Sequence, residues 1–267
     1  MARAMGRSRA LILLTAALAV MWASAAPARP AAKGCGPRGY SYAGLQAPRN
    51  AFGVAGTLSA AASPLVQRGH VAGWVGVGAP GQGPQGSDEW LQVGLNTIAG
   101  NPAKLYYEVA RASGIKYVEL ASDVPPGRSH HVAVLETARH TNFWRVWVDG
   151  RPASRPIWLP QSHGRLTPMA LAESWDGGAP ACNRYAYSFG AVSLAGRPGG
   201  AWSRLHRAEA LVLQDPGSRV VPARNGFMAV TAPPPLRPSV PPPSVRRAPS
   251  ATPALTATPV QPGRLGP

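Results

Sequence analysis

The pattern of hydrophobic and polar residues predicts an all-β chain. Helical periodicity is nearly absent between residues 26 and 231, where short runs rich in β-branched and aromatic residues alternate with Gly, Pro, Asn and Asp. The pattern gives twelve predicted strands, which is more than one open sheet usually holds, so we expect two packed antiparallel sheets. The predicted strands lie at 52–58, 70–77, 89–95, 104–110, 117–120, 130–137, 143–148, 156–159, 169–175, 184–194, 209–213 and 227–231.

The clearest predicted hairpin turns at Asp149-Gly150, because this dipeptide supplies the two positive φ angles of a type I′ turn. The strand before the turn carries aromatic residues on both faces, Trp144 with Val146 and Val148 on one and Phe143 with Arg145 and Trp147 on the other. One face therefore belongs to the core. The other lines a groove or packs under a long loop.

The N-terminus predicts export. Arginines at 3, 7 and 9 precede an apolar run over 10–22, and Ala23-Ser24-Ala25 follows as a small-residue cleavage site. The run is shorter than the ~20 residues of a membrane span, so a retained anchor is the weaker alternative. We expect a signal peptide over 1–25, a mature chain without a membrane span, and a secreted or envelope-associated location.

The C-terminus changes composition at about residue 232. Residues 232–267 are rich in Pro, Ser, Thr and Ala, and such a segment cannot bury enough apolar surface to fold. We expect a disordered, stiff spacer, with a docking ligand or a segment that spans the cell envelope as the alternatives. Residues 26–231 remain as one β-sandwich domain.

Charge and cysteine content narrow the class of protein. The net charge is +16, from 27 Lys and Arg against 11 Asp and Glu, but the cations are scattered singly, which does not favour specific nucleic-acid binding. The two cysteines, Cys35 and Cys182, are expected to form a disulfide after export, worth about 4–5 kcal/mol in the chain-entropy model. No ligand set for a metal and no cofactor motif is present.

The candidate chemistry lies around Gln92, a glutamine within the apolar run 90–94. An unpaired buried amide costs roughly 1–3 kcal/mol, so this side chain is expected to be hydrogen-bonded or aimed at a ligand. On the next predicted strand, alternation places Tyr106 and Glu108 on one face and Tyr107 on the other. A glutamine and a glutamate on successive strands can therefore face one cleft.

The order of several short motifs resembles the glutamic peptidase, or eqolisin, family. These are Val54-Ala55-Gly56-Thr57-Leu58, Gly73-Trp74-Val75-Gly76-Val77, Leu91-Gln92-Val93-Gly94, Tyr106-Tyr107-Glu108 and the segment from Cys182-Asn183 to Phe189. The resemblance implies a concanavalin A-like jelly roll whose concave sheet is the binding face. It also implies that Gln92 occupies the position of the family's catalytic glutamine, which polarises the scissile carbonyl.

The sequence departs from the family pattern at its acids. Gly78 and Asn96 stand where the resemblance implies aspartates, and Tyr187 is expected at the position of the catalytic glutamate. A tyrosine with a pKa of about 10 is not ionised at the pH where a carboxylate acts as a general base. Glu108 or Glu173 could supply the missing carboxylate, although pairing with arginines or with strand-end amides is the more ordinary role for both.

We therefore expect a binding module rather than an enzyme, with a glycan, wall polymer or extended peptide in the concave sheet. The alternatives are an acid endopeptidase that uses Gln92 with Glu108 or Glu173, and a structural envelope module. His130-His131 point to opposite faces of a strand and cannot share a metal, and Ser162-His163 lack a nucleophile turn. The residues expected to line the binding face are Trp74, Gln92, Tyr106, Glu108, Trp144, Trp147 and Tyr187.

Overall fold

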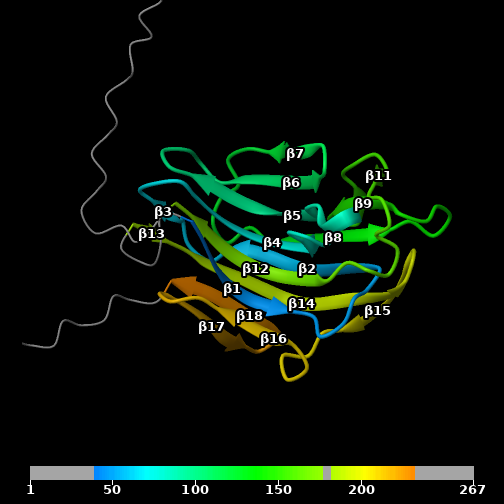
Figure 1. Cartoon of the computed structure of the whole chain (residues 1–267). Coiled ribbons are helices and arrows are strands. Elements are labelled where there is room, and N and C mark those ends of the chain that lie inside the picture. The colour runs from blue at the N-terminus through cyan, green and yellow to red at the C-terminus, as the bar shows by residue number, and fades with distance from the viewer. Residues whose placement is uncertain (1–38, 177–181, 232–267) are drawn as a thin grey trace, which may run out of the picture.

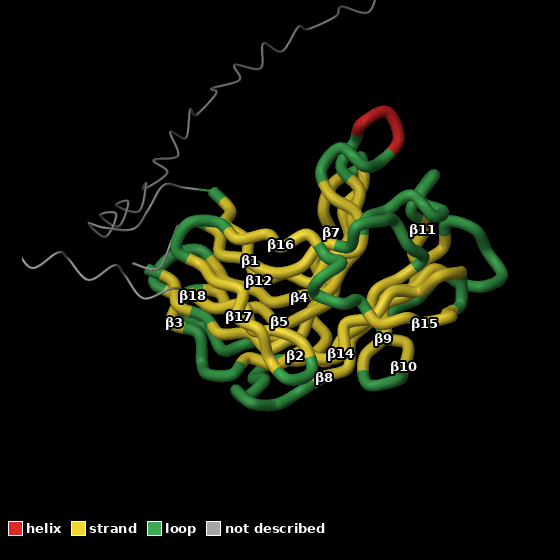
Figure 2. Tube along the Cα trace, turned by 90° about the horizontal axis from the view of Figure 1, so that it is seen from below, coloured by secondary structure: helices red, strands yellow, loops and turns green. Residues whose placement is uncertain are grey.

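The computed structural model describes residues 39–176 and 182–231, and these form a sandwich of two antiparallel sheets (Figure 1). A short 3-10 turn at Pro84–Gly86 is the one helical element among the described residues. Figure 2 shows the sheets as two layers, with the hairpin that bears this turn projecting beyond them. The prediction of an all-β jelly-roll sandwich is confirmed.

The first layer, which we call the front sheet, has seven strands, and those at its centre carry the candidate site residues. Their order is β16 (Leu211–Gln214), β1 (Tyr40–Gln46), β12 (Pro168–Trp175), β4 (His70–Ala79), β5 (Glu89–Ile98), β6 (Lys104–Arg111) and β7 (Gly114–Ala121).

The second layer, the back sheet, has nine strands, and a separate small sheet pairs β3 (Leu65–Val66) with β13 (Asn183–Arg184). The main order of the back sheet is β10 (Arg151–Pro152), β9 (Phe143–Val148), β8 (His130–Glu136), β2 (Gly53–Ala60), β14 (Ala186–Arg197), β18 (Gly226–Thr231) and β17 (Ser218–Ala223). In addition, β11 (Ile157–Trp158) pairs with β9, and β15 (Gly200–Arg204) pairs with β14.

The main core lies between the two sheets. Alternate residues of each strand point inward, so Val75 and Val93 of the front sheet belong to the same cluster as Leu58, Val134 and Trp144 of the back sheet. All five are fully buried. Burying large apolar side chains in this layer supplies the main force that holds the sheets together.

Most predicted strands are present with shifted ends, and β9 matches its prediction in full. Asp149 and Gly150 have φ angles of 50° and 77°, which confirms the left-handed turn between β9 and β10. The sequence pattern missed β1, β15 and β17. In β1 the alternation is masked by Gly44, where a Cβ would lie 2.2 Å from the carbonyl oxygen of Ala170 on β12.

Several predictions concern residues outside the described ranges. The signal peptide at 1–25, the spacer at 232–267 and Cys35 all lie there, so these assignments and the Cys35–Cys182 disulfide stay predictions. Cys182 is itself described and is 3% exposed. In the described part of the chain, no helix has the length and apolarity that a membrane crossing requires.

Glu89, at the start of β5, is a buried carboxyl group at an inward-facing position of the front sheet. It is 1% exposed, and neither of its carboxyl oxygens has a hydrogen-bond partner among the described residues. Burial raises the pKa of Glu89 to about 7, and the positive charge of Arg111 only partly opposes this. The folded state therefore favours the neutral acid.

This pKa predicts a stability that depends on pH. The contribution of the neutral Glu89 to the free energy of unfolding is complete below its ordinary pKa of 4.5. It is lost as the pH rises through about 7. We expect Glu89→Gln to be more stable than the parent chain by about 2–3 kcal/mol at pH 8, with little difference at pH 4.5. Urea denaturation at both pH values measures this, with the exposed Glu209→Gln as the control. An equal effect of Glu89→Gln at both pH values would contradict the prediction.

Candidate functional site

The outer face of the front sheet carries a second cluster of side chains, separate from the main core. Trp74, Tyr106 and Leu171 are buried there together with Ala72 and Met169. They occupy the positions of β4, β6 and β12 that alternate with the inward-facing core residues. We call this surface of β12, β4, β5 and β6 the site face.

Gln92 lies on the site face and is 7% exposed. Its strand pairs place Gly76 of β4 beside it on one side and Glu108 of β6 on the other, and Met169 of β12 lies beyond Gly76. Side chains that face each other across antiparallel strands have Cβ atoms about 4.5–5.5 Å apart. Glu108 is therefore the carboxylate adjacent to Gln92, as its position after Tyr106 and Tyr107 predicted.

The amide of Gln92 is held on one side only. Its Nε2 donates a hydrogen bond to the Tyr106 hydroxyl at 3.0 Å, and the Tyr106 ring stacks on Tyr117 at 5.2 Å between centroids. No described residue donates a hydrogen bond to the amide oxygen of Gln92. The side chain is thus fixed in orientation by Tyr106 while its oxygen stays available as an acceptor for a ligand.

Glu173, on β12, is anchored at both of its carboxylate oxygens. Trp74 Nε1 donates to Oε2 at 2.9 Å, and His70 Nε2 lies 3.2 Å from Oε1. Glu173 is 6% exposed, so these contacts offset part of the cost of burying its charge. A carboxylate held in this way positions the Trp74 indole and the His70 ring.

Aromatic rings continue from Glu173 toward the end of the sheet. Tyr40 stacks on Tyr42 at 5.8 Å and lies 6.4 Å from Trp175, which itself stacks on His70 at 5.6 Å. Tyr40 and Trp175 are 55% and 40% exposed. Tyr40 and Trp175 therefore leave aromatic surface open to solvent close to the buried Glu173.

Glu108 differs from Glu173 because its second oxygen has no hydrogen-bond partner among the described residues. Trp90 Nε1 donates to Oε1 at 3.0 Å. Burial raises the pKa of Glu108, the negative charge of Glu173 raises it further, and the Trp90 hydrogen bond lowers it. Burial also raises the pKa of Tyr106 well above its ordinary value, so the hydroxyl that Gln92 contacts is neutral.

Two glycines make the close packing of the site face possible. A Cβ at Gly94, which lies between Trp74 and Tyr106, would be 2.7 Å from the Trp74 Cβ. A Cβ at Gly76 would be 2.8 Å from the Gln92 Cβ. The glycines in Trp-Val-Gly and Gln-Val-Gly are therefore positions where a larger residue would displace a site side chain.

The structure corrects the predicted role of Tyr187. Tyr187 lies on β14 of the back sheet, is fully buried in the main core, and packs against Gly73 from the inner side of β4. It cannot line the site face, because the front sheet separates it from Gln92. The residue that lies in register with Gln92 on β12 is Met169, and the second acid of the site face is Glu173.

Trp144 and Trp147 do not lie on the site face either. Both belong to β9 of the back sheet, where Trp144 points into the main core and is fully buried. Trp147 occupies the alternate, outward position on the same strand. The alternation was predicted correctly, but the sequence did not show that this hairpin belongs to the sheet opposite Gln92.

The sequence analysis placed Trp74, Gln92, Tyr106, Glu108 and Glu173 among its candidates, and the structure brings these five together. It missed His70, Trp90 and the aromatic residues Tyr40, Tyr42 and Tyr117. The period-two spacing from Trp74 to His70 and from Gln92 to Trp90 is the signal that could have found two of them.

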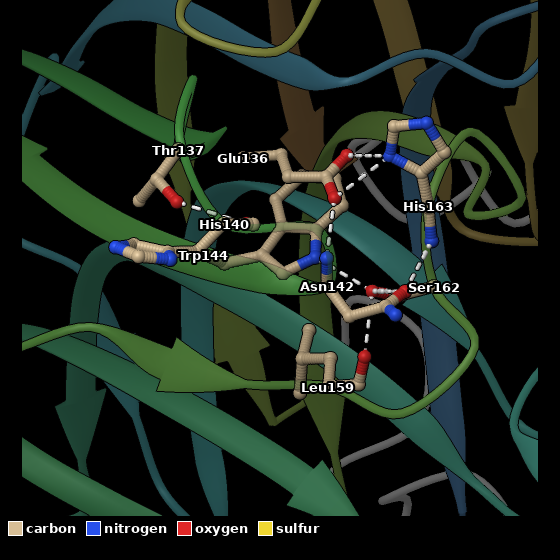
Figure 3. Close-up of polar contacts among 8 residues, drawn as sticks. All are labelled: Glu136, Thr137, His140, Asn142, Trp144, Leu159, Ser162 and His163. Atoms are coloured by element: carbon tan, nitrogen blue, oxygen red, sulfur yellow. Dashed lines mark hydrogen bonds and ion pairs between the residues drawn. The ribbon is translucent and has the colours of Figure 1, made fainter.

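A second polar cluster, around Glu136, stabilises the loop from 159 to 163 on the other side of the molecule (Figure 3). The fully buried Glu136 accepts from the Asn142 backbone N–H at 2.6 Å and lies 3.0 Å from His163 Nδ1. Ser162 accepts from Trp144 Nε1 at 2.7 Å and donates to the Leu159 carbonyl at 2.8 Å. With its hydroxyl engaged in this way, Ser162 is not an activated nucleophile.

Comparison with known proteins identifies the fold. No family model and no curated protein matches the chain. Among solved structures, scytalido-glutamic peptidase with a peptide-based transition-state analogue superposes with a TM-score of 0.55 at 12% identity, covering 73% of this chain and 100% of that one. A second structure of this peptidase, with a transition-state analogue inhibitor, gives a TM-score of 0.52 at 13% identity, over 72% and 98% of the chains.

The chain has the fold of the glutamic peptidases. The resemblance inferred from the strand motifs is therefore confirmed for the fold. At this level of identity the likeness extends to the fold alone. The site face of this chain has a glutamine and two glutamates on one sheet surface.

The contacts of Glu108 predict opposite responses to two substitutions. Glu173→Gln removes a neighbouring negative charge and should lower the pKa of Glu108, whereas Trp90→Phe removes a hydrogen bond to the charged form and should raise it. Carboxyl-carbon NMR titration measures both shifts, and Asp123→Asn, on an exposed turn, is the control. Shifts of the same sign in the two variants would show that Glu108 does not share the site with both residues.

Proposed function

We propose that the site face binds an extended polymer, a glycan, a wall polymer or an extended peptide, without cleaving it. The observation that carries this proposal is the one-sided anchoring of Gln92. Tyr106 fixes its amide nitrogen, and the amide oxygen is left as an acceptor between two aromatic clusters. A preorganised amide of this kind pairs with the hydroxyl or amide groups of a polymer at little ordering cost.

The aromatic residues supply the apolar part of the proposed binding surface. Tyr40 and Trp175 lie at the end of the site face that Glu173 and His70 occupy, and Tyr117 lies beside Tyr106 at the other. A ligand that reaches from one cluster to the other crosses several strands. This arrangement favours an extended chain over a compact small molecule.

The acids of the site face support binding rather than catalysis. Attack of water on an amide needs an ionised carboxylate that is free to take a proton. Both oxygens of Glu173 are engaged with Trp74 and His70, and the residue in register with Gln92 on β12 is Met169. Glu173 acts in this proposal as a positioning residue for the Trp74 indole.

A second candidate function, an acid endopeptidase, is favoured by the pairing of Gln92 with Glu108. The two side chains are cross-strand neighbours, and Glu108 keeps one oxygen without a partner among the described residues. In this mechanism Glu108 takes a proton from the attacking water, while the second N–H of the Gln92 amide stabilises the oxyanion that forms on the carbonyl. Glu108 then returns the proton to the amine nitrogen as the C–N bond breaks. Because the pKa of Glu108 is raised, the increase of peptidase activity with pH would occur at a higher pH than with an ordinary glutamate as the base.

Binding is tested with the full chain and immobilised polymers. The probes are chitin, cellulose, peptidoglycan and an unfolded protein such as reduced, carboxymethylated lactalbumin. We expect at least one to bind, and Gln92→Ala to weaken that binding about tenfold or more, since a lost hydrogen bond in a buried site costs about 1–3 kcal/mol. Trp202→Ala, an exposed residue of the back sheet, is the matched control. Retention of none of these polymers, or equal retention by Gln92→Ala, would overturn the proposal.

Cleavage is tested on the same unfolded protein between pH 2 and pH 6. The binding proposal predicts intact substrate at every pH. Cleavage that is lost in both Gln92→Ala and Glu108→Gln, but kept in Glu119→Gln, would instead establish the peptidase. Because Glu119 of β7 pairs with Lys104 at the start of β6, its substitution changes local charge without removing a contact of Gln92.

A further inference from the structure

A cavity of about 360 Å³ lies at the outer edge of the back sheet, away from the site face. Arg145 and Trp147 of β9 line it together with the turn that carries Arg139 and His140, and Pro156 closes another side. On the neighbouring strand Trp147 is paired with Ala133, whose small side chain leaves room beside the indole. The volume is within the range of about 300–1,000 Å³ that small-ligand sites occupy.

This cavity contains donors without acceptors. Arg145 Nε and Trp147 Nε1 are shielded from solvent, and neither has a hydrogen-bond partner among the described residues. Leaving such a group unpaired costs roughly 1–3 kcal/mol, and more when the group is charged. Arg139 and His140 are exposed at the rim and add donors of the same kind. Arg145, Arg139 and His140 therefore give the cavity a basic lining.

The acid nearest to these donors is committed elsewhere. Glu136 is the one acidic residue among the described residues that line the cavity, and it is fully buried. Its carboxylate points toward His163 and the Asn142 backbone, whereas Thr137 and His140 lie on its other side (Figure 3). Glu136 therefore leaves the positive charge of Arg145 uncompensated in this cavity.

We propose that this cavity is a second binding site, specific for a sugar ring that carries a carboxylate or sulfate group. The guanidinium of Arg145 matches the geometry of two anion oxygens. The indole ring supplies an apolar wall for the C–H face of the sugar. The ligand class is thus an acidic saccharide, and the site is independent of Gln92 and the site face.

The test uses the full chain labelled with ¹⁵N and the side-chain N–H signals of Trp147 and Arg145. The titrants are an oligogalacturonate, a sulfated galactan oligosaccharide, a neutral galactan oligosaccharide of equal length and sodium sulfate. We expect one or both acidic oligosaccharides to shift these two signals, and the stronger one identifies the anion. The neutral sugar should bind at least tenfold more weakly.

Two substitutions in the site have a matched control on the same hairpin. Arg145→Gln, which removes the guanidinium, and Trp147→Ala, which removes the indole wall, should each weaken binding of the acidic oligosaccharide about tenfold or more. Arg151→Gln, an exposed arginine that does not line the cavity, should leave it unchanged. The Gln92→Ala variant should also bind normally, which separates this site from the polymer-binding face.

Three results would overturn the proposal. One is the absence of any shift with either acidic oligosaccharide in the parent chain. A second is equal affinity for the neutral and acidic sugars, because the site would then not recognise the anionic group, or equal affinity for sodium sulfate and the sulfated sugar, because it would then not recognise the sugar ring. The third is unchanged binding in Arg145→Gln whose thermal unfolding matches that of the parent chain.

Discussion

The approach of Trp74 to Tyr106 across Gly94 is the contact on which the site face depends. Glycine is required there because a Cβ would be 2.7 Å from that of Trp74. The two rings bury each other on the outer side of a sheet whose inner side already forms the core. Once they are packed, the Trp74 indole meets Glu173, and the Tyr106 hydroxyl meets Gln92.

The polar groups of the site face are held by hydrogen-bonding groups that belong to aromatic side chains. The indole N–H groups of Trp74 and Trp90 donate to Glu173 and Glu108, and the Tyr106 hydroxyl accepts from the Gln92 amide. Aromatic residues can do this because one end of each side chain is apolar and the other carries a hydrogen-bonding group. The same residues therefore exclude water from the surface and fix the orientation of its charges. A surface built in this way is rigid before a ligand arrives, which reduces the entropy lost on binding.

The two sheets carry different chemistry on their outer sides. The front sheet gathers Gln92 with two glutamates, whereas the partly buried Arg145 and Trp147 of the back sheet line a cavity whose own acid is engaged elsewhere. Arg145 and Trp147 point out of the sandwich because they alternate along β9 with Trp144 and Val146, which face the core.

The sequence by itself determined the elements and much of the candidate site. Period-two alternation placed Tyr106 and Glu108 on one face, and Asp149-Gly150 predicted its turn, because both depend on local backbone geometry. Only the tertiary structure decided which sheet each strand joined. For that reason Tyr187 and Trp144 were assigned to the wrong surface, although both lie in strands that were predicted. Strand order follows from pairing between distant segments, such as β12 beside β4, and no local pattern in either strand encodes that choice.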